Sequence, residues 1–330
     1  MINVAIVGCG YWGPNMARVF SQNKGTQLYM CCDLVDANLE KMKSIYPHIK
    51  ITKDFNQLLL DPQVHAVVIV TPTRTHFPLV KQALLAGKHV LVEKPMTETS
   101  SQAKELVDIA AQQNRILMVD HTFEYHPAIR KIKQIIDSKE LGDIYYIKAN
   151  WLNLGLLQPD VNVVFDLATH IFSIINYFTG EKPEGLKAVG KAYVREEIEE
   201  VAHVLVSYPN NVLATINVSW LEPCKQRTIT IVGSKKMLMF DLLNKQEHVK
   251  VYDKGVINEG TENIISYRTG DIYSPHVLNL EPLKVEAEHF AECIRDNKKP
   301  QTCGENGMQV VRLLECVNRS LKHNGAEVLL

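Results

Sequence analysis

The sequence has no strong excess of charge and no long apolar run. Lys and Arg number 36 against 37 Asp and Glu, so the formal net charge is −1 at pH 7. This balance argues against a dedicated nucleic-acid surface and against a surface for anionic membranes. No stretch approaches the roughly 18 consecutive apolar residues of a membrane span, so we expect a protein that does not cross a bilayer.

The sequence also lacks a regular cysteine pattern. Its seven cysteines are odd in number, and none of them forms a CxxC pair. This favours reduced thiols over a disulfide framework or a zinc site, and we predict no bound metal. The N-terminal run from Met1 to Val7 has neither the basic region nor the cleavage site of a secretion signal, so we expect a cytoplasmic protein.

The composition is that of a globular protein with two domains. Hydrophobic residues make up 46% and charged residues 22%, and the 17 Gly and 14 Pro exclude collagen-like and low-complexity chains. At roughly 150 residues per domain, 330 residues predict about two domains. The pattern changes near residue 120, so we place the first domain at 1–120 and the second at 121–330.

The first 120 residues alternate short apolar runs with helical patterns. The expected strands are Ile2 to Val7, Gln27 to Cys32, Val64 to Val70, His89 to Val92 and Ile116 to Val119. The expected helices are Pro14 to Lys24, Asp36 to Tyr46, 75–86 and 100–113. Strands separated by helices of this length indicate right-handed βαβ crossovers, so we predict an α/β fold with a doubly wound parallel sheet.

After residue 120 the pattern becomes that of hairpins. From Val212 to Trp220 apolar and mostly polar residues alternate, which predicts a strand with one buried face. Helices are expected at 128–138, 166–179, 283–296 and 305–321, and strands at 144–151, 186–194, 201–208, 212–220, 227–233, 236–241 and 247–252. We predict an α+β domain built on an open, mainly antiparallel sheet. The segment 253–281 has weak periodicity, and we expect a long loop or a subunit-contact arm there.

A glycine-rich motif follows the first strand. Gly8-Cys9-Gly10-Tyr11-Trp12-Gly13 is a GxGxxG sequence that opens a helix, and Asp33 ends the second strand. This is the Rossmann arrangement, in which the glycines admit a pyrophosphate and the acidic residue binds a ribose. Asp33 followed by Leu34 favours NAD over NADP, because a carboxylate repels a 2′-phosphate and no arginine neutralises it.

Further polar residues follow the later strands. Thr71-Pro72-Thr73 and His76 come after one strand, and Glu93-Lys94-Pro95 ends the next. Ligands of open α/β sheets bind at the carboxyl ends of the strands, so Lys94 is placed to exchange a proton with a substrate hydroxyl. The cofactor contacts that we predict are Gly8, Gly10, Tyr11, Trp12, Gly13, Asp33, Thr71, Pro72, Thr73, His76, Glu93 and Lys94.

A second cluster lies in the expected helix after residue 165. Asp166 and His170 are four residues apart and therefore share one helix face. The pair fits a carboxylate that orients the substrate beside a general acid or base, and a surface Asp–His pair has the same spacing. Metal binding is the poorer interpretation, because no further ligands fall at clear spacing. His121 fits a structural or a substrate-lining role.

Three motifs together carry a resemblance to a known family. They are the GxGxxG motif, the run Ala86-Gly87-Lys88-His89-Val90-Leu91-Val92-Glu93-Lys94-Pro95 and Asp166-x-x-x-His170. With them the whole chain resembles the Gfo/Idh/MocA oxidoreductases. The resemblance implies NAD(P), hydride transfer at a secondary alcohol of a sugar or cyclitol, and Lys94, Asp166 and His170 as catalytic residues. It also implies a homo-oligomer, a dimer or tetramer, associated through the outer face of the large sheet.

Shorter runs resemble the branch of this family that acts on nucleotide-linked sugars. They are residues 10–15, His121-Thr122-Phe123, 159–163 and 218–221. This resemblance implies oxidation of UDP-N-acetylglucosamine at its 3-hydroxyl, before a pyridoxal-phosphate aminotransferase in 2,3-diamino sugar synthesis of the lipid A type. The chain departs from many relatives at Tyr125-His126-Pro127, so substrate contacts there do not carry over.

The substrate side of the site is the least constrained by sequence. Lys225 and Arg227 are candidate cations for a diphosphate by charge and position, and a solvated surface pair is the alternative. The substrate contacts that we predict are Lys94, His121, Tyr125, Asn153, Asn162, Asp166, His170, Lys225 and Arg227. Other sugars, an inositol, a nucleotide-linked uronic acid and a non-catalytic NAD-binding regulator remain as alternatives, and either Lys94 or His170 is the base.

Overall fold

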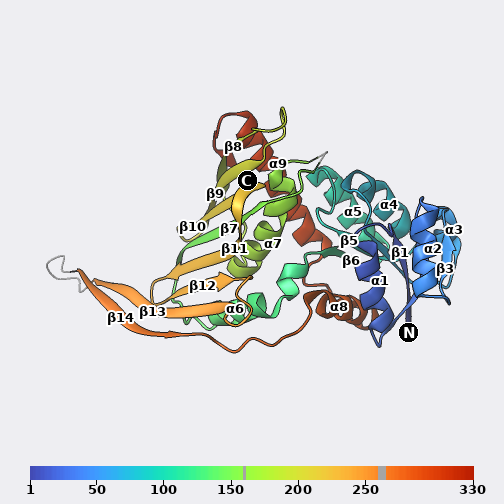
Figure 1. Ribbon diagram of the computed structural model, residues 1–330, viewed down its shortest axis with the longest axis horizontal. Helices are drawn as coiled ribbons and strands as arrows, with labels where there is room; N and C mark the ends of the chain where they lie inside the picture. Colours follow the sequence, from blue (N-terminus) through green and yellow to red (C-terminus); the bar gives the residue numbers. More distant parts are fainter. Residues whose placement is uncertain (159–160, 259–264) are drawn as a thin grey trace. The chain divides into compact units, whose positions relative to one another are not determined.

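The computed structural model describes residues 1–158, 161–258 and 265–330, which divide into two compact units (Figure 1). The first unit comprises Met1–Tyr125 and Leu280–Arg312, and the second comprises His126–Asn279 and Leu313–Leu330. The sequence places everything after residue 120 in one domain, whereas the chain returns to the first unit at Leu280. It returns because a buried phenylalanine near the C-terminus, Phe290, packs edge-to-face on Phe20, with ring centroids 6.1 Å apart.

The first unit is built on a six-stranded parallel sheet with the strand order β3-β2-β1-β4-β5-β6. The strands are β1 (Ile2–Val7), β2 (Thr26–Cys32), β3 (Lys50–Thr52), β4 (Ala66–Ile69), β5 (His89–Glu93) and β6 (Leu117–Asp120). All four residues of β4 are buried, as expected for a parallel strand covered on both faces. The predicted doubly wound sheet is confirmed.

Helices flank this sheet. They are α1 (Gly13–Gln22), α2 (Asp36–Ile45), α3 (Phe55–Leu60), η1 (Thr73–Thr75), α4 (His76–Leu85), α5 (Ser100–Gln112), η2 (Thr122–Tyr125) and α8 (Pro282–Asp296), with the first part of α9 (Gly304–Lys322). The sequence prediction missed β3 and α3. These elements have three and six residues, which is too short for a hydrophobic period to be recognised.

The second unit is built on a nine-stranded sheet with the order β14-β13-β12-β11-β7-β10-β9-β8-β15. Its strands are β7 (Ile144–Leu154), β8 (Gly185–Lys191), β9 (Val201–Tyr208), β10 (Val212–Ser219), β11 (Leu221–Gly233), β12 (Met237–Asp241), β13 (Val249–Asn258), β14 (Ile265–Tyr273) and β15 (Val328–Leu329). All pairs are antiparallel except β10 with β7. The predicted mainly antiparallel sheet is confirmed.

One expectation for this sheet differs from the structure. The segment 253–281, expected as a long loop or an arm, contains the end of β13 and all of β14, which pair as a hairpin visible in orange in Figure 1. Residues 259–264 between the two strands lie outside the described residues. The pattern gave no strand signal because most side chains of β14 are exposed and no apolar face alternates with a polar one.

One face of the nine-stranded sheet is covered by helices. The helical elements of this unit are α6 (Pro127–Asp137), η3 (Val164–Ala168), α7 (Thr169–Thr179) and the last part of α9, and α7 packs against β7 and α6. Along β7, Ala149 and Trp151 are buried on the covered face, while Tyr146 and Lys148 are exposed on the other. Among the described residues, no helix is sufficiently long and apolar for a membrane span.

Candidate functional site

The glycine motif forms a tight turn between β1 and α1. Gly8 has φ +93°, and a Cβ there would lie 2.8 Å from the carbonyl oxygen of Val70. A Cβ on Gly13 would lie 2.1 Å from the carbonyl oxygen of Gly8. The backbone turn therefore requires glycine at both positions, because any side chain would collide with main-chain atoms.

Gly10 has a different role in the same turn. A Cβ on Gly10 would meet nothing within 4 Å, so glycine there is not demanded by packing and leaves open space beside the backbone. Helix α1 begins at Gly13, and no side chain caps its first N–H groups. Open backbone next to uncapped N–H donors and the positive end of a helix dipole fits the pyrophosphate of a dinucleotide.

Asp33 is fixed at the end of β2 by hydrogen bonds from the turn. Its Oδ2 accepts from the N–H of Cys9 at 2.6 Å and from Nδ2 of Asn38 at 3.2 Å, and its Oδ1 accepts from the N–H of Val35 at 2.8 Å. A carboxylate has about four acceptor directions, so one remains for a ribose hydroxyl. The sequence prediction did not include Cys9 and Asn38 in this arrangement.

The other predicted cofactor residues differ in what they contact. Tyr11 is 95% exposed in the glycine loop, whereas Trp12 packs against the core and donates its Nε1–H to Oδ2 of Asp120 at 3.1 Å. His76 is fully buried, with its Nδ1 3.0 Å from the carbonyl oxygen of Pro95 and its Nε2 2.7 Å from that of Thr71. His76 thus connects the segments after β4 and β5.

The residues at the ends of β4 and β5 form the remaining part of this edge. Thr71 accepts a hydrogen bond at its Oγ1 from Thr75 at 2.7 Å, and Pro72 and Thr73 continue the same turn. Glu93 ends β5, and the next residue, Lys94, is half-buried. These segments lie at the carboxyl ends of parallel strands, where ligands of such sheets bind.

His121 follows β6 and is 1% exposed. Burial lowers the pKa of its imidazole to about 4, so the ring is neutral at physiological pH. Neither ring nitrogen has a hydrogen-bond partner among the described residues. A buried imidazole without a protein partner has its donor and its acceptor available for a ligand.

Tyr125 and Asn162, two of the predicted substrate contacts, form hydrogen bonds within the protein. Tyr125 is buried in the core of the first unit, and its hydroxyl lies 3.0 Å from Oγ1 of Thr302. In the second unit, Asn162 donates to Oε2 of Glu199 and to Oδ1 of Asn318. Its own Oδ1 accepts from the N–H of Phe165, so its side-chain groups connect three segments of the chain.

The local sequence after Tyr125 explains where the chain changes course. His126 caps α6 by accepting at Nδ1 from the N–H of Ala128 at 3.2 Å, and Pro127 occupies the first helical position. Proline at that position and an acceptor before it are helix-start signals. The departure from the family pattern at 125–127 therefore encodes a helix start. Pro159 and Asp160, part of the narrower resemblance, lie outside the described residues.

Asp166 and His170 lie in a distorted helix of the second unit. The residues of η3 adopt a π-helical turn, and α7 continues from Thr169 as an α-helix. The sequence predicts one regular helix over 166–179, and the difference is local, because a π turn is a single wider turn that frequently occurs at functional sites. Oδ2 of Asp166 accepts from Nε1 of Trp220 at 3.1 Å, which fixes the carboxylate. His170 follows and is half-buried.

Sequence reasoning missed the support behind this pair. The guanidinium of Arg195 lies 5.5 Å from the ring centroid of Trp220, the residue that holds Asp166. Arg195 also donates Nε to the fully buried Glu200 at 3.4 Å, and that carboxylate accepts from three backbone N–H groups, those of residues 193–195. No spacing signal in the sequence links Arg195 to Asp166, because Trp220, which comes from a distant segment, connects them.

Arg227 is a buried cation of the second unit. It is 9% exposed, and its guanidinium lies 5.5 Å from the ring centroid of Trp151. Its Nη1 donates to the carbonyl oxygens of Leu152 at 3.0 Å and Gln226 at 2.8 Å, and its Nη2 donates to Oδ1 of Asn153. Burial lowers the pKa of Arg227 to about 10, and the negative charge of Asp166 partly opposes the shift.

Lys225 behaves differently from its neighbour. It is exposed near the start of β11, so the solvated alternative describes Lys225 but not Arg227. Arg227 and Asn153, two of the predicted substrate residues, come together directly, and the charge of Asp166 acts on the same guanidinium. The structure therefore places the amide oxygen of Asn153, the guanidinium of Arg227 and the carboxylate of Asp166 in one part of the second unit.

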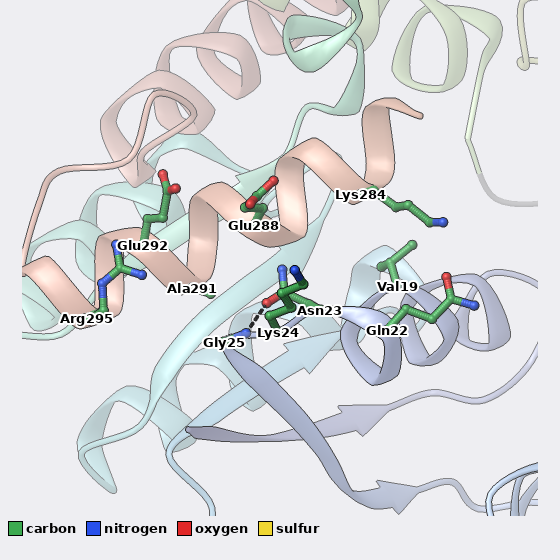
Figure 2. Close-up of a pocket in the computed structure, with 10 residues that line it drawn as sticks. All are labelled: Val19, Gln22, Asn23, Lys24, Gly25, Lys284, Glu288, Ala291, Glu292 and Arg295. Atoms are coloured by element: carbon green, nitrogen blue, oxygen red, sulfur yellow. Dashed lines mark hydrogen bonds between the residues drawn. The ribbon is translucent and has the colours of Figure 1, made fainter. Parts of the chain in front are cut away.

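A surface hollow of about 360 Å³ also lies in the first unit, where the end of α1 meets α8 (Figure 2). It is at the opposite end of α1 from the glycine turn, about 15 Å away for a ten-residue helix. Its lining comprises Val19, Gln22, Asn23, Lys24, Gly25, Lys284, Glu288, Ala291, Glu292 and Arg295. None of the predicted site residues lines this hollow.

No cluster of three or more His, Cys, Asp or Glu side chains that could hold a metal ion occurs in the described part of the chain. The seven cysteines are free thiols, and Cys224 is the exposed one among them.

Comparisons with known proteins agree with this geometry. Residues 2–121 match a family model described as "Oxidoreductase family, NAD-binding Rossmann fold", and residues 129–239 match "GFO/IDH/MocA C-terminal domain". A UDP-N-acetylglucosamine 3-dehydrogenase from Acidithiobacillus ferrooxidans is 27% identical over 77% of this chain and 78% of its own. A myo-inositol 2-dehydrogenase from Thermotoga maritima is 24% identical over 97% of this chain and 96% of its own.

Solved structures show the same fold. The crystal structure of an aldose-aldose oxidoreductase from Caulobacter crescentus has a TM-score of 0.85 at 18% identity, and covers 100% of this chain and 99% of its own. A scyllo-inositol dehydrogenase from Lactobacillus casei, with bound NAD(H) and scyllo-inositol, has a TM-score of 0.82 at 20% identity, and covers 100% and 99%. From the family models and the glycine turn together, we conclude that this chain is an NAD-binding oxidoreductase of the Gfo/Idh/MocA family.

Proposed function

We propose that the protein oxidises the 3-hydroxyl of UDP-N-acetylglucosamine to the 3-keto sugar with NAD. The observation that carries the proposal is Arg227, a buried guanidinium on the same unit as Asp166 and His170. Its hydrogen bonds go to neutral oxygens, and no carboxylate among the described residues bonds to it. A buried cation without a bonded anion suits a diphosphate.

The proposed chemistry divides between groups of the two units. A bound nicotinamide would supply the hydride acceptor for the sugar carbon, with Asp33 and the glycine turn holding the dinucleotide. Lys94 of the first unit or His170 of the second accepts the proton of the hydroxyl, and Asp166, held by Trp220, orients the substrate. His121, whose ring nitrogens have no partner among the described residues, is proposed to contact the sugar.

A substrate panel tests this proposal. NADH formation is followed by absorbance with UDP-N-acetylglucosamine, UDP-N-acetylgalactosamine, UDP-glucose, UDP-glucuronic acid, free N-acetylglucosamine and myo-inositol. We expect the highest kcat/KM with UDP-N-acetylglucosamine. A higher value for any free sugar or inositol would refute the nucleotide-sugar assignment.

Arg227 provides a sharper test of the same site. Replacing it by Met should raise KM for the UDP-sugar by about 10- to 100-fold, the cost of one lost charge-assisted hydrogen bond, and leave KM for NAD unchanged. Lys225→Ala is the matched control, since Lys225 is exposed, and should change KM by less than about threefold. Equal effects of the two variants would contradict the role of Arg227.

A second substrate class is favoured by a specific observation. The relative named a myo-inositol 2-dehydrogenase aligns over 97% of this chain, so an inositol is the second candidate substrate. A nucleotide-linked uronic acid is a further candidate, because Arg227 would also pair with a carboxylate. The panel above distinguishes the three, and NAD binding without turnover on any substrate would point to a regulator.

The proposed partners follow from the product. A 3-keto sugar is consumed by an aminotransferase that uses pyridoxal phosphate, so NADH yield should rise when that enzyme and an amino donor are added. We also propose a homo-oligomer through the outer face of the nine-stranded sheet. Exposed apolar side chains at Tyr146, Leu205 and Leu213 support this, since contiguous exposed apolar area marks interaction surfaces.

A further inference from the structure

Three carboxyl side chains meet inside the first unit. Glu93 and Asp120 end the adjacent strands β5 and β6 and are paired in register. Glu286 comes from α8, more than 160 residues later in the sequence, and is 0% exposed. Burial, followed by the charge of Asp120, raises the pKa of both glutamates well above the usual range. Helix α8 packs against η2, which directly follows β6 and Asp120, and the charge of Asp120 acts on both glutamates, so the three carboxyls form one cluster.

The hydrogen bonds of the cluster are unevenly distributed. Asp120 is well provided with donors, because its Oδ2 accepts from Nε1 of Trp12 at 3.1 Å and its Oδ1 from the hydroxyl of Thr122. Both carboxyl oxygens of Glu286, and Oε2 of Glu93, are buried and have no partner among the described residues. An ionised Glu286 would be a buried charge without a donor, which is strongly unfavourable. A protonated Glu286 avoids that cost and has a hydroxyl to donate to Asp120.

The other groups around Glu286 do not supply a neutralising charge. The hydroxyl of Thr122 favours its ionised form, but burial and the charges of Asp120 and Glu93 outweigh it. Tyr125, which also faces Glu286, is a buried phenol whose pKa is raised well above its usual value, so it is neutral. Lys94 acts on Glu93, where its charge lowers the pKa but not enough to reverse the shift, and the neutral His121 follows Asp120.

We propose that Glu286 is a positioning residue for the cofactor: as a protonated acid it donates a hydrogen bond to Asp120 and thereby holds Trp12 and the glycine loop. Trp12 lies between Gly10 and Gly13 and is the residue that precedes α1. A donor on one side of Asp120 fixes the rotation of its carboxylate, which keeps Oδ2 directed at the indole. The inference depends on NAD binding alone and goes beyond the proposed substrate.

The first test measures NAD dissociation constants of the full-length protein by calorimetry, without any sugar. Glu286→Gln should bind NAD within about twofold of the wild type, because the amide also donates to Asp120. Glu286→Leu removes the donor and should weaken NAD binding by about 3- to 10-fold, as for one hydrogen bond. Trp12→Phe should give the same weakening, and the double variant should be no weaker than either. Glu288→Gln, an exposed glutamate of the same helix, is the control.

The second test separates positioning from packing through pH. The folded state raises the pKa of Glu286, so the proton adds stability that is complete below about pH 4.5 and is lost as pH rises toward the folded-state pKa. Gln does not titrate and does not lose stability in this way. The Tm of Glu286→Gln should therefore rise relative to the Tm of the wild type by at least about 3 °C from pH 5 to pH 8.

Three results would overturn the proposal. They are a Tm difference that does not change with pH, a Glu286→Gln variant that loses as much NAD affinity as Glu286→Leu, and a Trp12→Phe variant with normal affinity. If Glu286→Leu does not fold, the Gln and Phe variants still decide. Because none of these measurements includes a sugar, a wrong substrate assignment would leave them unchanged.

Discussion

The two sheets of this protein differ in how many of their faces are covered. In the first unit every residue of β4 is buried, whereas along β9 of the second unit buried and exposed side chains alternate. A parallel sheet is covered by crossover helices on both faces, and a mainly antiparallel sheet can leave one face open. The open face of the second unit, with the exposed side chains of Tyr146, Leu205 and Leu213, is therefore available to bind another molecule. Both faces of the sheet in the first unit are covered by its own helices, so that sheet is not available.

The functional groups of the two units are also assembled differently. In the first unit the cofactor turn is one short run, Gly8 to Gly13, supported by Asp33. In the second unit the acidic residue Asp166 depends on Trp220, and Arg227 depends on Asn153, each more than 50 residues away. We therefore expect the first unit, the cofactor half, to tolerate little local change, and the second unit to diverge among relatives with different substrates.

The largest expected effect is the loss of turnover when the proposed base of either unit is removed. Lys94→Ala and His170→Ala should each lower turnover at least about 100-fold, because proton transfer in the transition state is lost, and should leave NAD affinity nearly intact. Steady-state kinetics and calorimetry with NAD measure the two effects. Lys104→Ala, an exposed lysine of the first unit, is the control. Near-normal turnover in both variants would show that the catalytic residues are misassigned.

The cofactor half can be tested alone through its choice of dinucleotide. The double change Asp33→Ser with Leu34→Arg removes the carboxylate that repels a 2′-phosphate and adds a cation that pairs with it. The ratio of kcat/KM for NADP to that for NAD should rise by about 10- to 100-fold. Asp33→Ser alone should weaken NAD binding without gaining as much NADP activity. An unchanged ratio in the double variant would place the ribose elsewhere.

The open face of the second unit gives the next largest effect. Leu213 pairs in register with Tyr146 on this face. The variant Leu213→Glu should fold as a monomer but should not form the oligomer, because association would bury the new charge in the interface. We expect Leu213→Glu to weaken association at least about 10-fold, measured by light scattering after size exclusion. Leu60→Glu, an exposed leucine of the first unit, should leave the mass unchanged. The same mass for both variants would exclude this face.

The smallest effect concerns local stability in the first unit. Thr99 caps α5 by accepting from the N–H of Gln102, and the Gln102 side chain accepts from the N–H of Thr99. Thr99→Ala should lower the free energy of unfolding by about 1 kcal/mol, and Thr99→Ser should keep most of it. Urea denaturation measures both. Equal losses for Ala and Ser would mean that packing of the threonine methyl, and not the cap, supports the helix.

Much of the fold could be predicted because the main elements are long and regular. The strand from Ile2 to Val7 has the bounds that its apolar run predicts, and the helix at 36–46 ends one residue earlier than expected. Three features leave no recognisable hydrophobic period in the sequence and were therefore not predicted. Strand β3 is too short, most side chains of the hairpin strand β14 are exposed, and the π turn at Asp166 differs from an α-helix by a single extra residue per turn. The return of the chain to the first unit at Leu280 was missed for a different reason, since helix periodicity shows that a face is buried but not against which partner.

The candidate site divides in the same way. The GxGxxG turn and Asp33 are determined locally, by backbone sterics and by a strand end, so the sequence by itself fixes this half and its cofactor. The sequence did not reveal that Tyr125, Asn162 and His76 form hydrogen bonds within the protein, that Arg227 is buried while Lys225 is solvated, or that Glu286 lies near Asp120. The physical reason is that burial and hydrogen bonding depend on partners brought from distant segments, and no residue type or spacing specifies those partners.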